Sequence, residues 1–164
     1  MILLLALTFA VVCGEALAAG FLPANATGWH TWQVDEPNSL TAMCCSNSRR
    51  GDGSEAGCNL DSRNISFSDG GSCAATPGPL QVYVRLEGGR VKDIRMLSAN
   101  CVVATDSKIA DQGLVSVGEN IGWFRSVVED RSLAQSVREE ALFALASSGS
   151  DSAYAYLDGL LSRR

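Results

Sequence analysis

The sequence predicts an α+β protein in which a small antiparallel β-sheet, built on a hairpin, is followed by three C-terminal helices. Within residues 80–97, two runs of alternating apolar and polar side chains flank a pair of glycines, which is the pattern of a β-hairpin. From Ser116 onward the apolar period lengthens from two residues to about 3.6, the period of an amphipathic helix. The chain of 164 residues has the length of one domain, since a domain usually has roughly 100–200 residues.

The hairpin is the clearest local feature of the chain. Its alternation slips once in the second arm, where Val91 and Ile94 stand three positions apart. A β-bulge is therefore expected near Lys92 or Asp93. Between the arms, Gly88-Gly89 supplies the positive φ angles that a two-residue primed turn requires. The side chains expected on the buried face of the hairpin are Val82, Val84, Leu86, Val91, Ile94 and Met96.

Two further strands are predicted before the hairpin. Residues 28–34 alternate with Trp29 and Trp32 on opposite faces, so this strand is a candidate neighbour of the hairpin. A shorter strand is predicted at Asn64 to Ser68. The rest of residues 35–78 is polar and rich in turn formers, and cross-links usually stabilise a long irregular region of this kind.

Three helices are predicted after residue 115. Ser116 and Glu119 have the spacing of a capping box, so a first helix should follow and end near residue 130. A second helix is expected at residues 133–148 with Gly149 as its C-cap, and a third begins at Asp151 as N-cap. The side chains expected on the inner faces are Ile121, Phe124, Val127 and Val128, then Leu133, Val137, Ala141, Ala144 and Leu145, and finally Ala153, Tyr154, Leu157, Leu160 and Leu161.

The last two helices also resemble a known repeat. The run from Val137 to Ala146, the turn at Gly149 to Ala153, and the leucines at 157, 160 and 161 look like one HEAT-type helical hairpin. The resemblance implies a HEAT-like segment at residues 116–164, packed on a β domain at residues 29–115 or on a partner, because one repeat cannot bury its own face. The whole chain is similar to uncharacterised secreted bacterial proteins with a Cys-Cys pair, a Gly-x-Val hairpin and such a segment. This similarity implies a location and an architecture but no activity.

The N-terminus has the pattern of a secretory signal. The apolar run from Ile2 to Val12 is shorter than the ~20 residues that span a bilayer, and Ala16-Leu17-Ala18 has the small-x-small form of a cleavage site. We therefore expect residues 1–18 to be removed on export to the periplasm or the extracellular space, leaving a linker at 19–28 and no membrane span. The alternative is an N-terminal core helix, because no Lys or Arg precedes the apolar run.

The cysteine count is consistent with an oxidising compartment. Loss of Cys13 with the signal leaves Cys44, Cys45, Cys58, Cys73 and Cys101, which permits two disulfides and one remaining thiol. Adjacent cysteines rarely bond to each other, because their side chains diverge. The expected pairing joins one of Cys44 and Cys45 to Cys58 and the other to Cys101, with Cys73 unbonded. Two alternatives stay open, namely a four-thiolate zinc site and a reducible Cys44-Cys45 bridge with a redox role.

Charge and motifs exclude several function classes. The formal net charge of −5 and the pI of about 4.8 provide no basic surface for nucleic acid or anionic membrane. His30 is the only histidine, and its tryptophan neighbours favour a half-buried strand position over a catalytic one. The sequence contains no HExxH, P-loop or G-x-S-x-G motif, and no cofactor or metal is predicted. The acidic residues at 35–61 show no spacing that selects a catalytic pair or an EF-hand.

The sequence favours an exported, non-catalytic interaction or structural module with a protein partner. Large aromatic side chains are the candidates for its interface, since Trp and Tyr often anchor interfaces. These candidates are Trp29, Trp32, Trp123 and Tyr154. The alternative is a hydrolase or metal-dependent enzyme whose site lies in the loops of residues 35–78.

Overall fold

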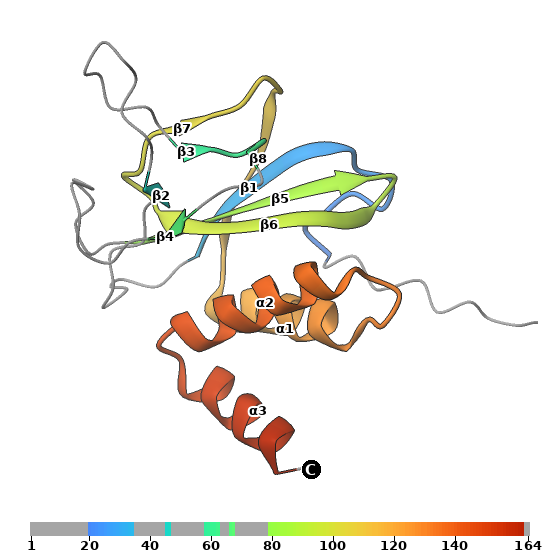
Figure 1. Ribbon diagram of the computed structural model, residues 1–164, viewed down its shortest axis with the longest axis vertical. Coiled ribbons are helices and arrows are strands. Elements are labelled where there is room, and N and C mark those ends of the chain that lie inside the picture. Colours follow the sequence, from blue (N-terminus) through green and yellow to red (C-terminus); the bar gives the residue numbers. More distant parts are fainter. Residues whose placement is uncertain (1–19, 35–44, 47–57, 63–65, 68–78, 163–164) are drawn as a thin grey trace, which may run out of the picture.

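The computed structural model describes residues 20–34, 45–46, 58–62, 66–67 and 79–162. Figure 1 shows a β-sheet with helices against one of its faces and short strands against the other, which is the predicted α+β class. The proposed signal at 1–18, Cys44, Cys73 and most of the 35–78 loops lie outside the described residues.

The main sheet has four strands in the order β6-β5-β1-β8. They are β1 (Gly28–Val34), β5 (Leu80–Glu87), β6 (Arg90–Ser98) and β8 (Ile109–Val115). Strand β5 pairs antiparallel with both β1 and β6, whereas β8 pairs parallel with β1. The sheet is therefore mixed and only mostly antiparallel. The reason is that residues 99–108 carry the chain back along the sheet, so that β8 runs in the same direction as β6.

The hairpin prediction is confirmed in detail. Gly88 and Gly89 have φ angles of 57° and 78°, which suit the two-residue turn. The register shifts between Arg85 and Leu86, leaving Lys92 as the extra residue of the expected bulge. The turn is also fastened to the N-terminal segment, because the Gly89 N–H donates to the Ala26 carbonyl at 2.8 Å.

Both faces of the sheet are covered, because alternate side chains along each strand enter different clusters. Trp32, Val82 and Ile94 belong to the larger cluster, which lies against the helices. Trp29 and Tyr83 point to the opposite face, where they form a smaller cluster with the short strands. Those short strands are β3 (Cys58–Asn59) and β7 (Val103–Ala104), which pair in parallel. Two further short strands, β2 (Cys45–Ser46) and β4 (Ser66–Phe67), pair antiparallel with each other, and β4 lies within the predicted 64–68 strand.

The three predicted helices are present as α1 (Val117–Glu129), α2 (Gln135–Ser147) and α3 (Asp151–Leu161). The capping box at Ser116 and Glu119 is confirmed. Gly149, with φ 70°, follows the end of α2. Asp151 was predicted as the N-cap of the third helix, but the cap is the extended Ser150 and Asp151 is the first helical residue. The buried side chains of α1 and α2 include Ile121, Phe124, Val127, Val128, Val137, Ala141, Ala144 and Leu145, as the period predicted.

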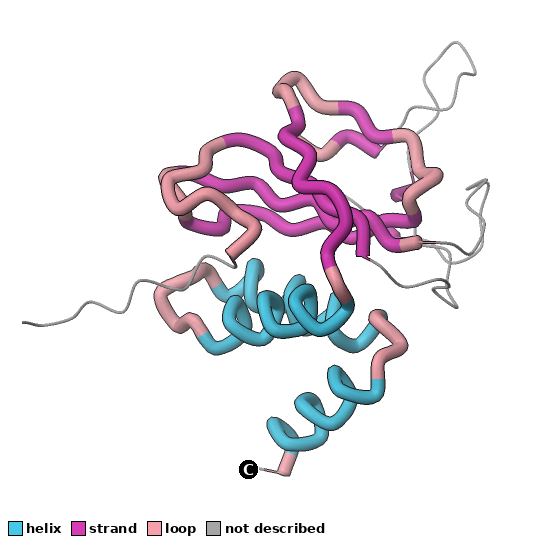
Figure 2. Tube along the Cα trace, turned by 180° about the vertical axis from the view of Figure 1, so that it is seen from behind, coloured by secondary structure: helices cyan, strands magenta, loops and turns pink. Residues whose placement is uncertain are grey.

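Helix α3 is the least buried of the helices. Figures 1 and 2 show α1 and α2 alongside the sheet, with α3 angled away from it. Only Ala153 of α3 is fully buried, while Leu157 and Leu160 are partly buried against the core. The prediction of Tyr154 and Leu161 on the inner face is wrong, because their exposed fractions are 45% and 67%. The HEAT-like character of this segment stays a prediction.

Candidate binding pocket between β6 and α2

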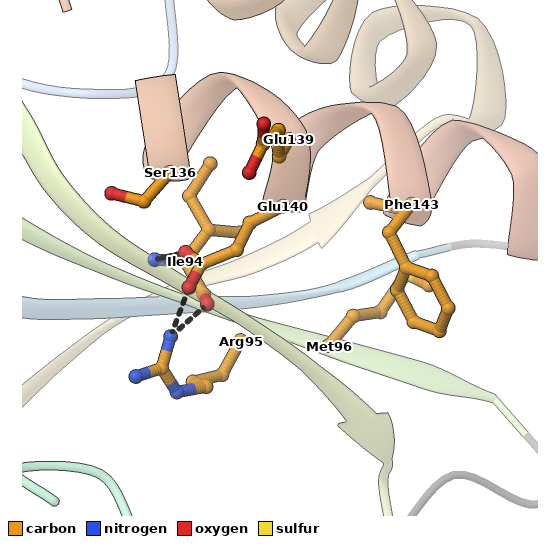
Figure 3. A pocket seen from close by; sticks show the side chains of 8 residues that line it. Ile94, Arg95, Met96, Ser136, Glu139, Glu140 and Phe143 are labelled. Atoms are coloured by element: carbon orange, nitrogen blue, oxygen red, sulfur yellow. Dashed lines mark hydrogen bonds and ion pairs between the residues drawn. The ribbon is translucent and has the colours of Figure 1, made fainter. Parts of the chain in front are cut away.

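A pocket of about 360 Å³ lies where α2 crosses the edge strand β6. Figure 3 shows how the side chains of the strand and of the helix converge there. The buried side of α2 carries the small side chains of Ala141 and Ala144, and Ala144 lines the pocket together with Met96 of β6. The lining residues are Ile94, Arg95 and Met96 from β6, and Ser136, Glu139, Glu140, Phe143 and Ala144 from α2.

The pocket has an apolar part and an acidic part. Met96 and Ala144 line the apolar part and are almost fully buried. Phe143, which directly precedes Ala144 in α2, also lines it but is 50% exposed. Glu139 and Glu140 precede Phe143 by one helical turn, so their carboxylates lie on the other side of the cavity. A large apolar surface beside two acidic groups is the usual composition of a small binding site.

Arg95 and Glu140 form the ionic centre of the site. One guanidinium nitrogen of Arg95, Nη1, donates to Glu140 Oε1 at 2.9 Å, to Asp93 Oδ1 and to the Ile94 carbonyl at 2.6 Å. The other Glu140 oxygen accepts the Ile94 N–H at 3.1 Å. The Arg95 side chain is 7% exposed, compared with 38% for Glu140, so the pair fastens the buried strand edge to the helix.

Burial raises the pKa of Glu140 above the ordinary range of a glutamate. The positive charge of Arg95 acts in the opposite direction, and the negative charge of Asp93 adds to the effect of burial. Glu140 therefore depends on Arg95 for its charged form, while Arg95 has two carboxylates to balance its own charge.

Strand β6 is an edge of the four-stranded sheet, and the N–H and C=O of Ile94 bond to side chains that line this pocket. In an antiparallel pair, every second residue directs its N–H and C=O away from the neighbouring strand. Ile94 is one of these residues, since both of its groups bond to side chains rather than to β5. Met96 stands two positions further along, opposite Val82, and its N–H and C=O have the same outward direction.

The three tryptophans predicted as interface residues lie in the core. Their exposed fractions are 1% for Trp29, 0% for Trp32 and 5% for Trp123. The rings of Trp32 and Trp123 meet edge to face with centroids 5.1 Å apart, between the sheet and α1. Because the sheet is covered on both faces, neither side of β1 leaves a tryptophan at the surface. Tyr154, 45% exposed, is the one member of the predicted set that offers surface to a partner.

The structure brings two of the predicted disulfide cysteines into one cluster. Cys58 is 2% exposed, and Cys101 packs against the cluster that contains it. The Cys58 N–H donates to the carbonyl of Val102, next to Cys101, at 2.7 Å. Of the adjacent cysteines, Cys45 belongs to β2 and Cys44 lies outside the described residues.

Neither His30 nor Asp61, the acidic loop residue within the described ranges, lines the pocket. His30 is 6% exposed on β1, where its Nδ1 lies 3.2 Å from Gln112 Nε2, in agreement with the buried strand position. Asp61 accepts hydrogen bonds from Trp29 and Thr105 and holds a loop together. In the part of the chain that the structure describes, no three potential metal-ligating side chains lie in a group.

The sequence interpretation missed the residues that line the pocket. Arg95, Glu140 and Phe143 stand outside the sets of side chains that were predicted to be buried in the hairpin and in the second helix, and no role was predicted for them. A Phe outside the apolar stripe of a helix, following two acids by one turn, is the signal that was available. No local pattern in the sequence predicted that the second arm of the hairpin would be an edge strand.

Within the described ranges, none of the helices has both the length and the apolar character needed to cross a bilayer. Comparison of the chain with protein-family models, with curated proteins and with solved structures gave no match.

Proposed function

We propose that the protein is an exported, non-catalytic interaction module that binds a protein segment in the pocket between β6 and α2. The observation that carries the proposal is the pocket itself, in which the half-exposed Phe143 and the buried Met96 form an apolar floor beside Glu139 and Glu140. Aromatic side chains at the mouth of a pocket commonly act as anchors for a partner.

The chemistry of the pocket favours binding over catalysis. A hydrolase requires a nucleophile that is activated by a base within hydrogen-bond reach. Glu140 already accepts from Arg95 and from the Ile94 N–H, and Glu139 accepts from Gln135 at 2.7 Å. The carboxylates of the pocket therefore serve as fixed negative charges. The alternative enzyme site in the 35–78 loops has no support from the described residues.

We also propose that the protein is exported and that Cys58 forms a disulfide with Cys101. The packing of the partly buried Cys101 against the cluster that contains Cys58, and the backbone hydrogen bond beside them, support this pairing over the one expected from the sequence. Mass mapping of non-reduced peptides tests it directly. A fragment that joins Cys58 to Cys101, in a chain lacking residues 1–18, is the expected result, while free thiols or bound zinc would contradict it.

Site-specific photo-crosslinking in the native host tests the binding function. A photoreactive phenylalanine analogue replaces Phe143 in one strain and Tyr154, which is similarly exposed on α3, in a matched control strain. We expect a discrete protein adduct from position 143 and none of that mass from position 154. If position 143 yields no adduct, or if both positions yield the same one, the pocket is not the binding site.

A further inference from the structure

We infer that the side chain which the partner segment places in this pocket is an arginine. This inference rests on the proposed function and names the chemistry of the partner. Three features support it, namely the order of apolar and acidic groups along α2, the charge of the pocket, and the half-exposed aromatic ring of Phe143.

Helix α2 places an aromatic ring and a carboxylate in one row beside the pocket. Glu139 and Phe143 are four residues apart, which corresponds to a rise of about 6 Å, so the two residues are neighbours on the helix surface. Figure 3 shows the Phe143 ring and Met96 toward one side of the pocket, and Glu140 with Arg95 toward the other. A basic side chain has an apolar stem and a charged end, so it can contact both parts of the pocket at once.

The charge of the pocket favours a cationic ligand. Among the lining residues that the structure describes, Arg95 alone is basic, and Asp93 and Glu140 already balance its charge. Glu139 is exposed and adds a further negative charge, and its hydrogen bond from Gln135 comes from a neutral group. A positive group of the partner is therefore complementary to the charge that remains.

Two basic side chains close to these acids in the sequence have their partners elsewhere. Arg138, which precedes Glu139 in α2, donates its Nε–H to the Val128 carbonyl of α1 at 2.9 Å. Lys92 of β6 forms an ion pair with Glu87 at 3.3 Å. Neither residue lines the pocket, so neither takes the place that the ligand is inferred to fill.

The ring of Phe143 favours arginine over lysine. A guanidinium group is planar, stacks on aromatic rings and binds a carboxylate through two parallel N–H donors. A lysine ammonium group is compact and more strongly hydrated, so it gains less from an aromatic surface. Phe143 and Glu139, neighbours on α2, offer the ring and the carboxylate that suit a guanidinium.

Selection of random seven-residue peptides from a display library on the purified protein tests the inference. We expect the bound peptides to be enriched in arginine over lysine and over acidic residues. Enrichment of acidic or purely apolar peptides, of lysine in place of arginine, or of no sequence at all would overturn the arginine ligand. If position 143 still forms its adduct in the host, that result leaves the proposed function standing.

A selected peptide then serves as the probe for titration by fluorescence anisotropy. Citrulline keeps the shape of arginine without its charge, and this replacement in the peptide should weaken binding about tenfold. Glu139→Gln should weaken binding of the arginine peptide about two- to fivefold, as expected for an exposed ion pair, and should leave the citrulline peptide unaffected. Equal effects on the two peptides would show that Glu139 does not pair with the arginine.

Two further variants separate the pocket from the rest of the surface. Glu129→Gln removes an equal charge from the exposed end of α1 and should leave binding of both peptides unchanged. A loss as large as that from Glu139→Gln would mean that net charge attracts the peptide, and would overturn the inference. Phe143→Leu keeps an apolar side chain without the ring, so it should reduce the preference for the arginine peptide over its lysine counterpart. An unchanged preference would contradict stacking on Phe143.

Discussion

Trp32 donates its indole Nε1–H to the Asn120 side-chain oxygen at 2.9 Å, between the middle of the sheet and the first turn of α1. Both residues are buried, with exposed fractions of 0% and 3%. The bond joins positions 88 residues apart and satisfies a donor that the core would otherwise leave unpaired.

Replacement of Asn120 with Ala is expected to lower the free energy of unfolding by about 1–3 kcal/mol, because the Trp32 indole then has no acceptor. Urea unfolding followed by tryptophan fluorescence measures the loss. The Trp32→Phe variant and the double variant complete a mutant cycle. Additive losses in that cycle would mean that the hydrogen bond contributes nothing to stability.

Gly89→Ala should destabilise the protein more than Gly113→Ala. Both glycines have φ 78°, a conformation that costs a non-glycine residue about 1–2 kcal/mol. A Cβ at Gly89 would also lie 2.0 Å from the Ala24 carbonyl oxygen, whereas none of the described atoms lies within 4 Å of a Cβ at Gly113. Chemical denaturation of the two variants compares the losses, and equal values would show that the turn does not press against the N-terminal segment.

Glu140→Ala and Glu139→Ala form a matched pair on adjacent positions of α2. Removal of Glu140 leaves the Ile94 N–H without its acceptor and Arg95 with one carboxylate fewer, which should cost about 1–3 kcal/mol of unfolding free energy. Glu139 is exposed, and its removal should change stability by no more than about 0.5 kcal/mol. Thermal unfolding of both variants measures the difference. A Glu140 variant as stable as the Glu139 variant would refute the role of this carboxylate at the strand edge.

Asp61 should contribute a pH-dependent part of the stability. Hydrogen bonds from Trp29 and Thr105 hold the pKa of this carboxyl below its ordinary value of 3.8. A lowered folded-state pKa means that the unfolded chain binds the proton more readily, so the contribution is present above pH 3.8 and is lost as the pH falls below it. Acid titration of wild type and Asp61→Asn, followed by tryptophan fluorescence, should show a steeper loss for the wild type. Parallel curves would contradict the coupling.

Local patterns in the sequence determined much of the architecture. The hairpin with its bulge, the strand at residues 28–34 and the capping box at Ser116 depend on backbone conformation and on contacts within a few residues. Such features are encoded where they occur, and for this reason the alternation and the two glycines were sufficient to predict them.

The tertiary structure decided which of these surfaces remained accessible. Strand β8 was not predicted because most of its residues are exposed and do not alternate, and its parallel position beside β1 depends on the path of residues 99–108. The burial of Trp29 follows from the short strands that cover the second face of the sheet. The pocket exists because β6 became an edge strand and α2 crossed it, which brought Arg95 to Glu140 over a separation of 45 residues. Pairings over such distances are set by packing of the whole chain, so the local sequence pattern did not contain them.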